Sequence, residues 1–335
     1  MSNTSNLYRE SIVIDGLNVS NWDSPAVYES LAGGGVTAMN ATIATWENYR
    51  ETLDQVQAWL QRFASCGETL MQIKTTEDIL EAKKNNKVGV ILGFQNATPI
   101  ENDLGHLDIF YALGVRIIQL TFHERNLLGD GCWESANAGL SNFGRDAVRE
   151  MNRLGILIDL SHVGQRSTLE AIDYSEKPVA VTHANCRAYY DNPRNKTDEA
   201  LKLLAARGGV AGATAIASFL RTQFESTLED FVDAIDDMVE RIGIDHVAFG
   251  SDFTQDQPTS FWRYIGSQQG TKYPAIFTRR GIRYDLMDLY PTDLETPDKL
   301  PNLAAALDKR GYSSEDIGKI LGLNWLRLFG DVWKA

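Results

Sequence analysis

The sequence predicts an α/β fold in which eight parallel strands close into a (β/α)8 barrel. Two observations carry this prediction. Apolar runs of strand character alternate with longer segments of helical periodicity, and 335 residues are enough for eight such units. Strands joined by crossover helices pair in parallel, and eight of them favour a closed barrel over an open sheet.

The expected elements follow one another regularly along the chain. The strands are the apolar runs at residues 11–15, 35–44, 88–95, 115–121, 156–161, 178–183, 208–214 and 246–251. Helical segments rich in Leu, Ala, Glu and Arg lie at 47–64, 75–84, 101–113, 141–154, 165–174, 196–206, 226–242, 301–309 and 314–330. We expect residues 1–335 to form one barrel domain. The long connection at about 254–300 is expected to act as a lid or as a subunit contact.

Composition and charge narrow the choice of partners. The net charge of −13 argues against nucleic acid or an anionic membrane as a partner, since both attract clustered Lys and Arg. Three cysteines without paired spacing suggest neither a disulfide framework nor a zinc knuckle. The first ten residues are polar and carry no export signal, and no apolar run is long enough to span a membrane. We expect a cytoplasmic protein that acts on small molecules.

Titratable side chains at the ends of apolar strands indicate where the chemistry lies. His162 and His183 each close such a run, and the helical segment between the runs makes them parallel neighbours. Asp252 closes the last strand, which in a closed barrel lies beside the first. Active sites of such barrels lie at the carboxyl ends of the strands. The sequence thus predicts a metal site at His162 and His183, with Asp252 as general acid and base; satisfied core histidines are the alternative.

Several motifs together resemble the membrane dipeptidase (renal dipeptidase) family of metallopeptidases, a branch of the amidohydrolase-like barrels. They are Asn126-Leu127-Leu128-Gly129-Asp130-Gly131-Cys132, Gly139-Leu140-Ser141-Asn142-Phe143-Gly144-Arg145, Asp159-Leu160-Ser161-His162, Thr182-His183-Ala184-Asn185, Asn192-Pro193-Arg194-Asn195 and Gly250-Ser251-Asp252-Phe253. The resemblance covers nearly the whole chain. It implies a hydrolase that cleaves dipeptides, including some with a D-residue at the carboxyl end, at two zinc ions joined by a glutamate. By position, His162 and His183 match ligands of one metal, Arg194 the residue that receives the substrate carboxylate, and Asp252 the acid/base aspartate.

The chain departs from this family pattern at the other metal. Leu17 and Val19 stand where the family has a His-x-Asp motif, and Gln95 stands for the bridging glutamate. Neither aliphatic side chain binds zinc, and an amide lacks the charge that holds two cations together. His123 falls one position after the family's substrate-polarising histidine, where strand alternation would turn it away from the mouth. We therefore expect at most one zinc ion, between His162 and His183.

Two functions of different classes remain open at this point. The first is a dipeptidase-like hydrolase acting on a small amide with a free carboxylate, with catalytic Asp252 and His183. Its substrate contacts are Arg194, His123, Gln95 and Asn96. If an ion is bound, Asp252, Gln95 or water completes its coordination. A metal-free hydrolase relying on Asp252 and His183 is a variant of it. The second is a barrel that has kept its pocket but lost catalysis and serves as a binding or regulatory protein. The family resemblance also implies a homodimer.

Overall fold

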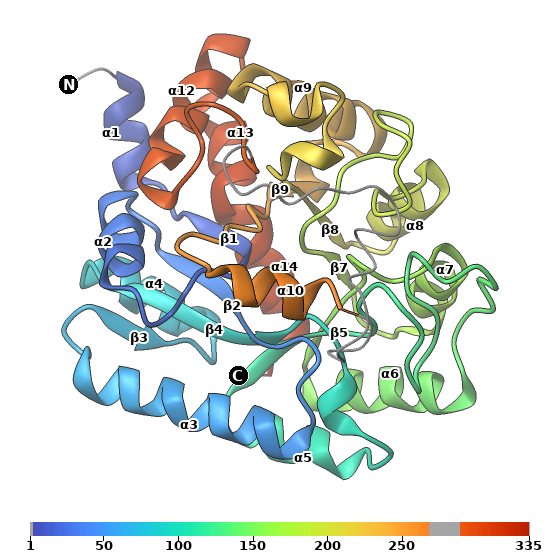
Figure 1. The fold of residues 1–335 in the computed structure, drawn as a ribbon. Coiled ribbons are helices and arrows are strands. Elements are labelled where there is room, and N and C mark those ends of the chain that lie inside the picture. The colour runs from blue at the N-terminus through green and yellow to red at the C-terminus, as the bar shows by residue number, and fades with distance from the viewer. Residues whose placement is uncertain (1–2, 268–288, 335) are drawn as a thin grey trace.

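The computed structural model describes residues 3–267 and 289–334, and eight parallel strands form its centre (Figure 1). In order around the sheet, the strands are β1 (Ile14–Asn18), β2 (Ala38–Ala44), β4 (Val88–Phe94), β5 (Val115–Gln119), β6 (Leu157–Asp159), β7 (Ala180–Val181), β8 (Val210–Ala213) and β9 (Val247–Phe249). Each of the eight overlaps a predicted run, and β1 extends to Asn18, beyond the predicted end at residue 15. The last strand returns to the first, since Asp252 N donates to Leu17 O at 3.0 Å and Val19 N to Phe253 O at 2.7 Å. The predicted (β/α)8 barrel is confirmed.

One further strand was not predicted. β3 (Leu70–Gln72) pairs in parallel with Val88–Val90, the first residues of β4. Only Leu70 of its three residues is buried, so the segment lacks the long apolar run that marks the barrel strands.

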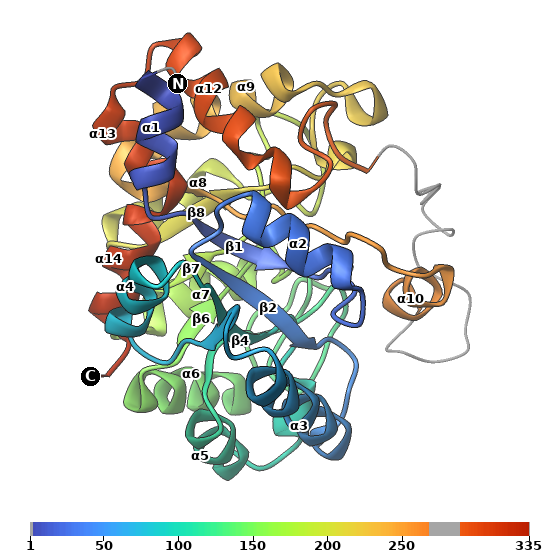
Figure 2. The ribbon, with the colours of Figure 1, turned by 90° about the vertical axis from the view of Figure 1, so that its left-hand side faces the viewer.

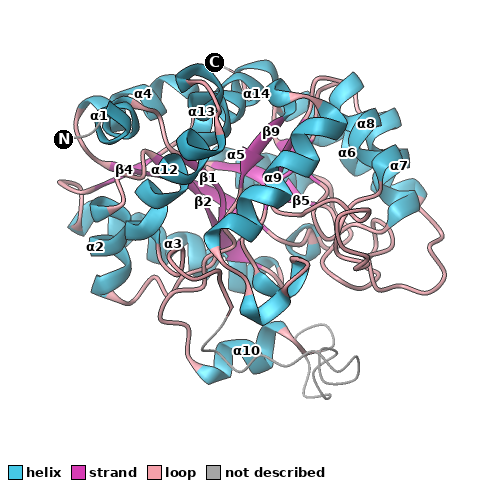
Figure 3. Ribbon diagram, turned by 90° about the horizontal axis from the view of Figure 1, so that it is seen from above, coloured by secondary structure: helices cyan, strands magenta, loops and turns pink. Residues whose placement is uncertain are grey.

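Helices surround the strands, as Figure 3 shows. They are α1 (Asn3–Glu10), α2 (Pro25–Gly33), α3 (Tyr49–Ser65), α4 (Thr76–Lys84), α5 (Gly105–Ala112), α6 (Asn142–Leu154), α7 (Gln165–Tyr174), α8 (Asp198–Ala206), α9 (Leu228–Ile242), α10 (Thr259–Ile265), α12 (Leu300–Arg310), α13 (Ser314–Gly318) and α14 (Asn324–Val332). Several begin at polar caps that satisfy the first backbone N–H groups, such as Asn48 with Glu51 and Thr75 with Asp78. No described helix is both long and apolar enough to cross a membrane.

The barrel interior is closed at the end opposite the site by α14. Its Trp325 is fully buried and donates from Nε1 to Phe249 O at 2.9 Å. Glycines make room for it and for the chain around it. A Cβ on Gly16 or Gly212 would lie 2.9 Å from the Trp325 ring, and one on Gly250 would lie 1.8 Å from Thr182 O. The strands pack this closely only because these residues have no side chain.

The long connection after β9 places α10 at the other end of the barrel from α14 (Figure 2). Ile265 of α10 is buried with Phe122 and Trp133, and Phe261 and Trp262 pack against the same group. The helix therefore lies over the carboxyl ends of the strands. Residues 268–288, the middle of the predicted connection, lie outside the described residues.

Candidate active site

Asp252 lies just beyond β9, at the seam where the barrel closes. Its backbone has a positive φ of 59°, and its carbonyl accepts a hydrogen bond from Tyr290 Oη at 2.6 Å. A non-glycine residue in this conformation is held there by its surroundings. Nearby Asp15, on β1, accepts hydrogen bonds from Ser251 N at 2.7 Å and Ser251 Oγ at 2.6 Å. The two strand ends are thus tied together beneath Asp252.

The Asp252 carboxyl group faces a small cavity and is only partly exposed. Burial raises its pKa to about 7, and the nearby Asp15 and Asp159 act in the same direction, whereas Arg194 opposes them. In the described part of the chain, no side chain donates a hydrogen bond to this carboxyl group. A carboxyl group with a pKa near 7 can take up and release a proton at neutral pH.

Three histidines form a hydrogen-bonded chain on another wall of the site. His162 Nδ1 lies 2.9 Å from His123 Nδ1, and His162 Nε2 lies 2.9 Å from His183 Nε2. Burial lowers the pKa of His162 and of His183 well below the ordinary value, and Arg194 adds to this effect. Both imidazoles are therefore neutral at physiological pH.

Asp159, at the end of β6, determines which nitrogen donates and which accepts in each hydrogen bond between the three imidazoles. It accepts from Thr182 Oγ1 at 2.6 Å, so Thr182 in turn accepts from His183 Nδ1 at 2.7 Å. A neutral imidazole has one donor and one acceptor nitrogen. His183 Nε2 therefore accepts from His162, and His162 Nδ1 accepts from His123. Asp159 also accepts from Ser161 N and Ser161 Oγ, so its buried charge is satisfied.

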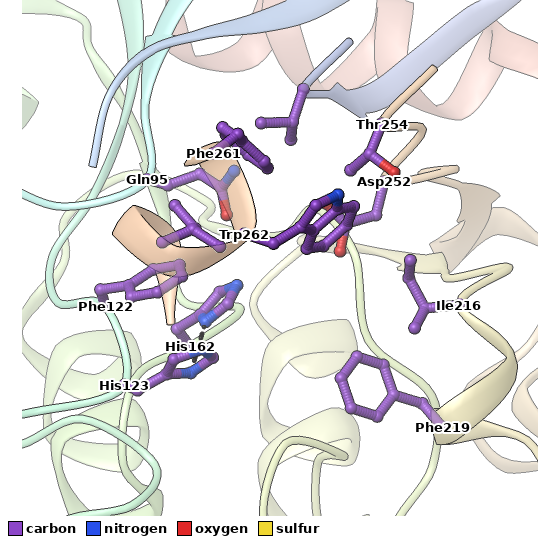
Figure 4. A pocket seen from close by; sticks show the side chains of 12 residues that line it. Gln95, Phe122, His123, His162, Ile216, Phe219, Asp252, Thr254, Phe261 and Trp262 are labelled. Carbon is purple, nitrogen blue, oxygen red and sulfur yellow. Dashed lines mark hydrogen bonds between the residues drawn. The ribbon is translucent and has the colours of Figure 1, made fainter. Parts of the chain in front are cut away.

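Figure 4 shows the cavity that Asp252, His162 and His123 border. It has a volume of about 60 Å³. Its polar lining consists of Gln95, His123, His162, Asp252 and Thr254, and its apolar lining of Val19, Phe122, Ile216, Phe219, Phe261, Trp262 and Ile265. Asp252 thus borders a largely apolar space, in which charge–charge and hydrogen-bond interactions are stronger than in water. The other predicted catalytic residue, His183, is fully buried and does not line the cavity.

The expected substrate contacts fall into two groups. His123 and Gln95 line the cavity. The expectation that strand alternation turns His123 away is wrong, because β5 ends at Gln119 and the chain beyond it no longer alternates. Gln95 Nε2 donates to Thr42 Oγ1 at 3.0 Å, and Figure 4 shows its amide oxygen turned toward the cavity.

Arg194 and Asn96 lie behind the wall. Arg194 is fully buried and donates to Ser161 O and to His183 O, each at 2.6 Å. Asn96 is buried, and its Oδ1 accepts from Asn126 Nδ2 at 2.8 Å. Neither residue lines the cavity. Because Arg194 does not line the cavity, a direct bond from its guanidinium group to a substrate carboxylate would require the cavity wall to rearrange.

The described residues do not fit a two-zinc centre. Val19 lines the cavity and Leu17 is buried, so an apolar surface stands where the family resemblance implies ligands. Across residues 3–267 and 289–334, no three His, Cys, Asp or Glu side chains converge as a metal group. His162 Nε2 and His183 Nε2 together supply two ligand nitrogens, one ligand fewer than catalytic zinc sites use.

Several residues of the site were not singled out by sequence reasoning. Phe122, Ile216 and Phe219 line the cavity but lie in segments after the strands, where no periodic pattern marks them. Thr182 and Asp159 appeared only as parts of motifs. The signal that could have identified them is their spacing, since each stands one or three positions before a histidine that closes a strand.

Comparisons with known proteins agree with this architecture. The family model of membrane dipeptidase (Peptidase family M19) matches residues 3–262 and 259–335. The chain is 31% identical over 294 residues to "Dipeptidase verJ" of Clonostachys rogersoniana, covering 86% of this chain and 67% of that protein. It is 31% identical over 287 residues to "Dipeptidase tcpJ" of Claviceps purpurea, covering 84% of this chain and 60% of that protein. The match therefore spans about two thirds or less of these relatives' length.

Solved structures give the same result. A crystal structure of an amidohydrolase from Pseudomonas aeruginosa superposes with a TM-score of 0.93 at 36% identity, covering 99% of both chains. A metallopeptidase from Rhodobacter sphaeroides, liganded with a phosphinate mimic of the dipeptide L-Ala-D-Ala, superposes with a TM-score of 0.80 at 21% identity. The match covers 97% of this chain and all of that one, and at this identity it supports the fold alone. Family match, relatives and fold together place the chain in the membrane dipeptidase family, Peptidase family M19.

Proposed function

We propose that this chain hydrolyses the amide bond of a dipeptide or a similarly small amide, with Asp252 as general acid and base and with at most one bound zinc ion. The observation that carries the proposal is the placement of Asp252. It projects from a constrained backbone into a largely apolar cavity, with His162 and His123 also on its wall. Membership in a dipeptidase family supports the reaction class.

The chain's own residues supply the proton transfers in this proposal. Asp252 takes a proton from a water molecule while that water attacks the carbonyl carbon of the substrate. Asp252 later gives a proton to the leaving amine. His123 and Gln95 line the cavity within reach of the substrate. The neutral His183, held by Thr182 and Asp159, orients His162. Zinc bound at His162 and His183 would supply a Lewis acid there.

Arg194 and Asn96 act from behind the wall in this scheme. The positive charge of Arg194 attracts the ionised Asp252 and disfavours protonation of His162 and His183. Its two bonds to backbone carbonyls hold the ends of β6 and β7 in register. We therefore propose that it positions the site and favours substrates that carry negative charge.

A second candidate function is a binding or regulatory barrel without catalysis. The apolar Leu17 and Val19, in place of metal ligands, favour it. The two functions differ in one measurable respect: a binding protein would retain affinity for small amides without turning them over.

Metal content and turnover decide between them. Protein produced with zinc is analysed for the ion, and a dipeptide panel is then assayed with and without a chelator, alongside Asp252→Asn. We expect at most one zinc ion per chain and turnover that Asp252→Asn abolishes. Binding without turnover in the wild type would support the second function, and two zinc ions per chain would contradict the proposed site. The cytoplasmic location and the homodimer remain predictions; light scattering tests the latter.

A further inference from the structure

A second cavity adjoins the candidate active site. It has a volume of about 240 Å³ and is lined by Thr254, Gln255, Asp256, Gln257, Trp262, Leu289, Tyr290, Glu295 and Thr296. Thr254 and Trp262 also line the cavity at Asp252. We call the cavity at Asp252 the inner compartment and the second one the outer compartment.

The two compartments are joined through Thr254, which lines both and contacts Tyr290 of the outer compartment. Tyr290 Oη lies 2.8 Å from Thr254 Oγ1 and donates to Asp252 O at 2.6 Å. A side chain of the outer compartment thus contacts the backbone of the candidate acid/base residue. The outer lining is mostly polar, whereas the inner one is mostly apolar.

The inner compartment alone is too small for the proposed substrates. Its 60 Å³ is well below the volume of about 150 Å³ of a cavity that binds benzene, and a dipeptide has more non-hydrogen atoms than benzene. The outer compartment is four times larger. Figure 4 shows the Trp262 indole lying across the view between His162 and Asp252. It packs edge to face on Phe261, with ring centroids 5.3 Å apart.

We propose that the two cavities are parts of one elongated substrate site and that Trp262, which divides them, sets the length of substrate accepted. The inner compartment takes the scissile amide, and the outer one takes a polar, hydrogen-bonding extension of the substrate. The indole must turn aside before an extended substrate reaches Asp252. This inference rests on the proposed amide hydrolysis, which names the group bound at Asp252.

The test compares a short and a long amide. The short probe is N-acetylalaninamide, and the long probe is the same amide extended by two glutamine residues. Dissociation constants are measured by calorimetry in an Asp252→Asn background, where the amide is not consumed, and kcat/KM is measured with Asp252 present. Each assay is run with Trp262, Trp262→Phe and Trp262→Ala. Phe261→Ala is the matched control, because Phe261 is the neighbouring aromatic residue on α10 and lines only the inner compartment.

Trp262→Ala should shift the ratio of affinities toward the long probe by roughly three- to tenfold, the factor expected when one aromatic contact no longer has to be broken. Trp262→Phe should give a smaller shift, and Phe261→Ala should change the ratio by less than about twofold. An unchanged ratio in Trp262→Ala, or an equal shift in Phe261→Ala, would overturn the proposal.

A structural readout separates this proposal from the proposed function. Crystals of Trp262→Ala soaked with indole should show one continuous space from Asp252 to Tyr290, with indole bound at its centre. If that space is continuous but no amide binds or is hydrolysed, the proposed function fails while Trp262 still divides one site. If the compartments stay separate without the indole, the inference fails whatever the enzyme hydrolyses.

Discussion

Replacing Asp252 by asparagine should stabilise the protein at alkaline pH while abolishing its proposed activity. Burial raises the pKa of Asp252 to about 7 from an ordinary value near 3.8. The folded protein therefore holds this proton more tightly than the unfolded chain does. The stability that the protonated Asp252 contributes is fully present below the ordinary pKa and is lost as the pH rises through about 7. Asparagine has no proton to lose, so the variant escapes this loss.

The magnitude follows from the displacement of the pKa. Each pH unit corresponds to about 1.4 kcal/mol, so a rise from 3.8 to about 7 costs about 4 kcal/mol above neutral pH. Water reaches part of the Asp252 side chain and lowers this cost. We expect the advantage of Asp252→Asn in free energy of unfolding to grow by ~1–2 kcal/mol between pH 5 and pH 8.

Urea unfolding at the two pH values measures this difference. Asp256→Asn is a suitable control, because Asp256 has the same φ of 59° in an exposed position and reports the effect of the exchange on a left-handed backbone. The kcat/KM of Asp252→Asn on any amide that the wild type hydrolyses should fall at least ~100-fold. The reasoning would be refuted if the difference in free energy of unfolding between Asp252→Asn and the wild type were the same at both pH values. It would also be refuted if the variant kept its activity.

Three further predictions concern the metal site and the barrel. Combining Leu17→His, Val19→Asp and Gln95→Glu should raise the zinc content above that of the wild type, measured by elemental analysis after dialysis; no gain would mean that the backbone there cannot hold an ion. Asp159→Asn should lower the free energy of unfolding in urea by about 3 kcal/mol, because two hydroxyl and two amide donors lose a charged acceptor; a loss below 1 kcal/mol would show that its charge is not needed. Gly250→Ala should unfold the protein or cost more than ~3 kcal/mol, since its Cβ would lie 1.8 Å from a backbone oxygen; a normal circular dichroism melting curve would contradict the packing described.

Local sequence patterns predicted most of the fold. Apolar runs identified all eight barrel strands, because strands buried on both sides are mostly apolar and stand out from the helices between them. The helices α1, α2 and α10 and the strand β3 were not predicted. Each is short, and its position depends on the barrel against which it packs.

Single residues at strand ends also indicated the site. His162, His183 and Asp252 follow apolar runs, and the barrel topology alone implies that such residues share one mouth. The chain of three imidazoles was beyond the reach of sequence reasoning. His123 joins it only because the chain leaves β5 at Gln119 and turns inward, a change of direction that alternation along a strand does not contain.

What the sequence by itself determined is the order of strands and helices, the family and the identity of the titratable groups, because these depend on patterns within a few residues. Only the tertiary structure decided which of these groups face the cavity. Arg194 donates its hydrogen bonds to backbone carbonyls and does not line the cavity. Trp262, far along the chain from the histidines, lies between the two compartments beside them. Such choices depend on which side chains the closed barrel brings together, and residues distant in sequence fill that space jointly.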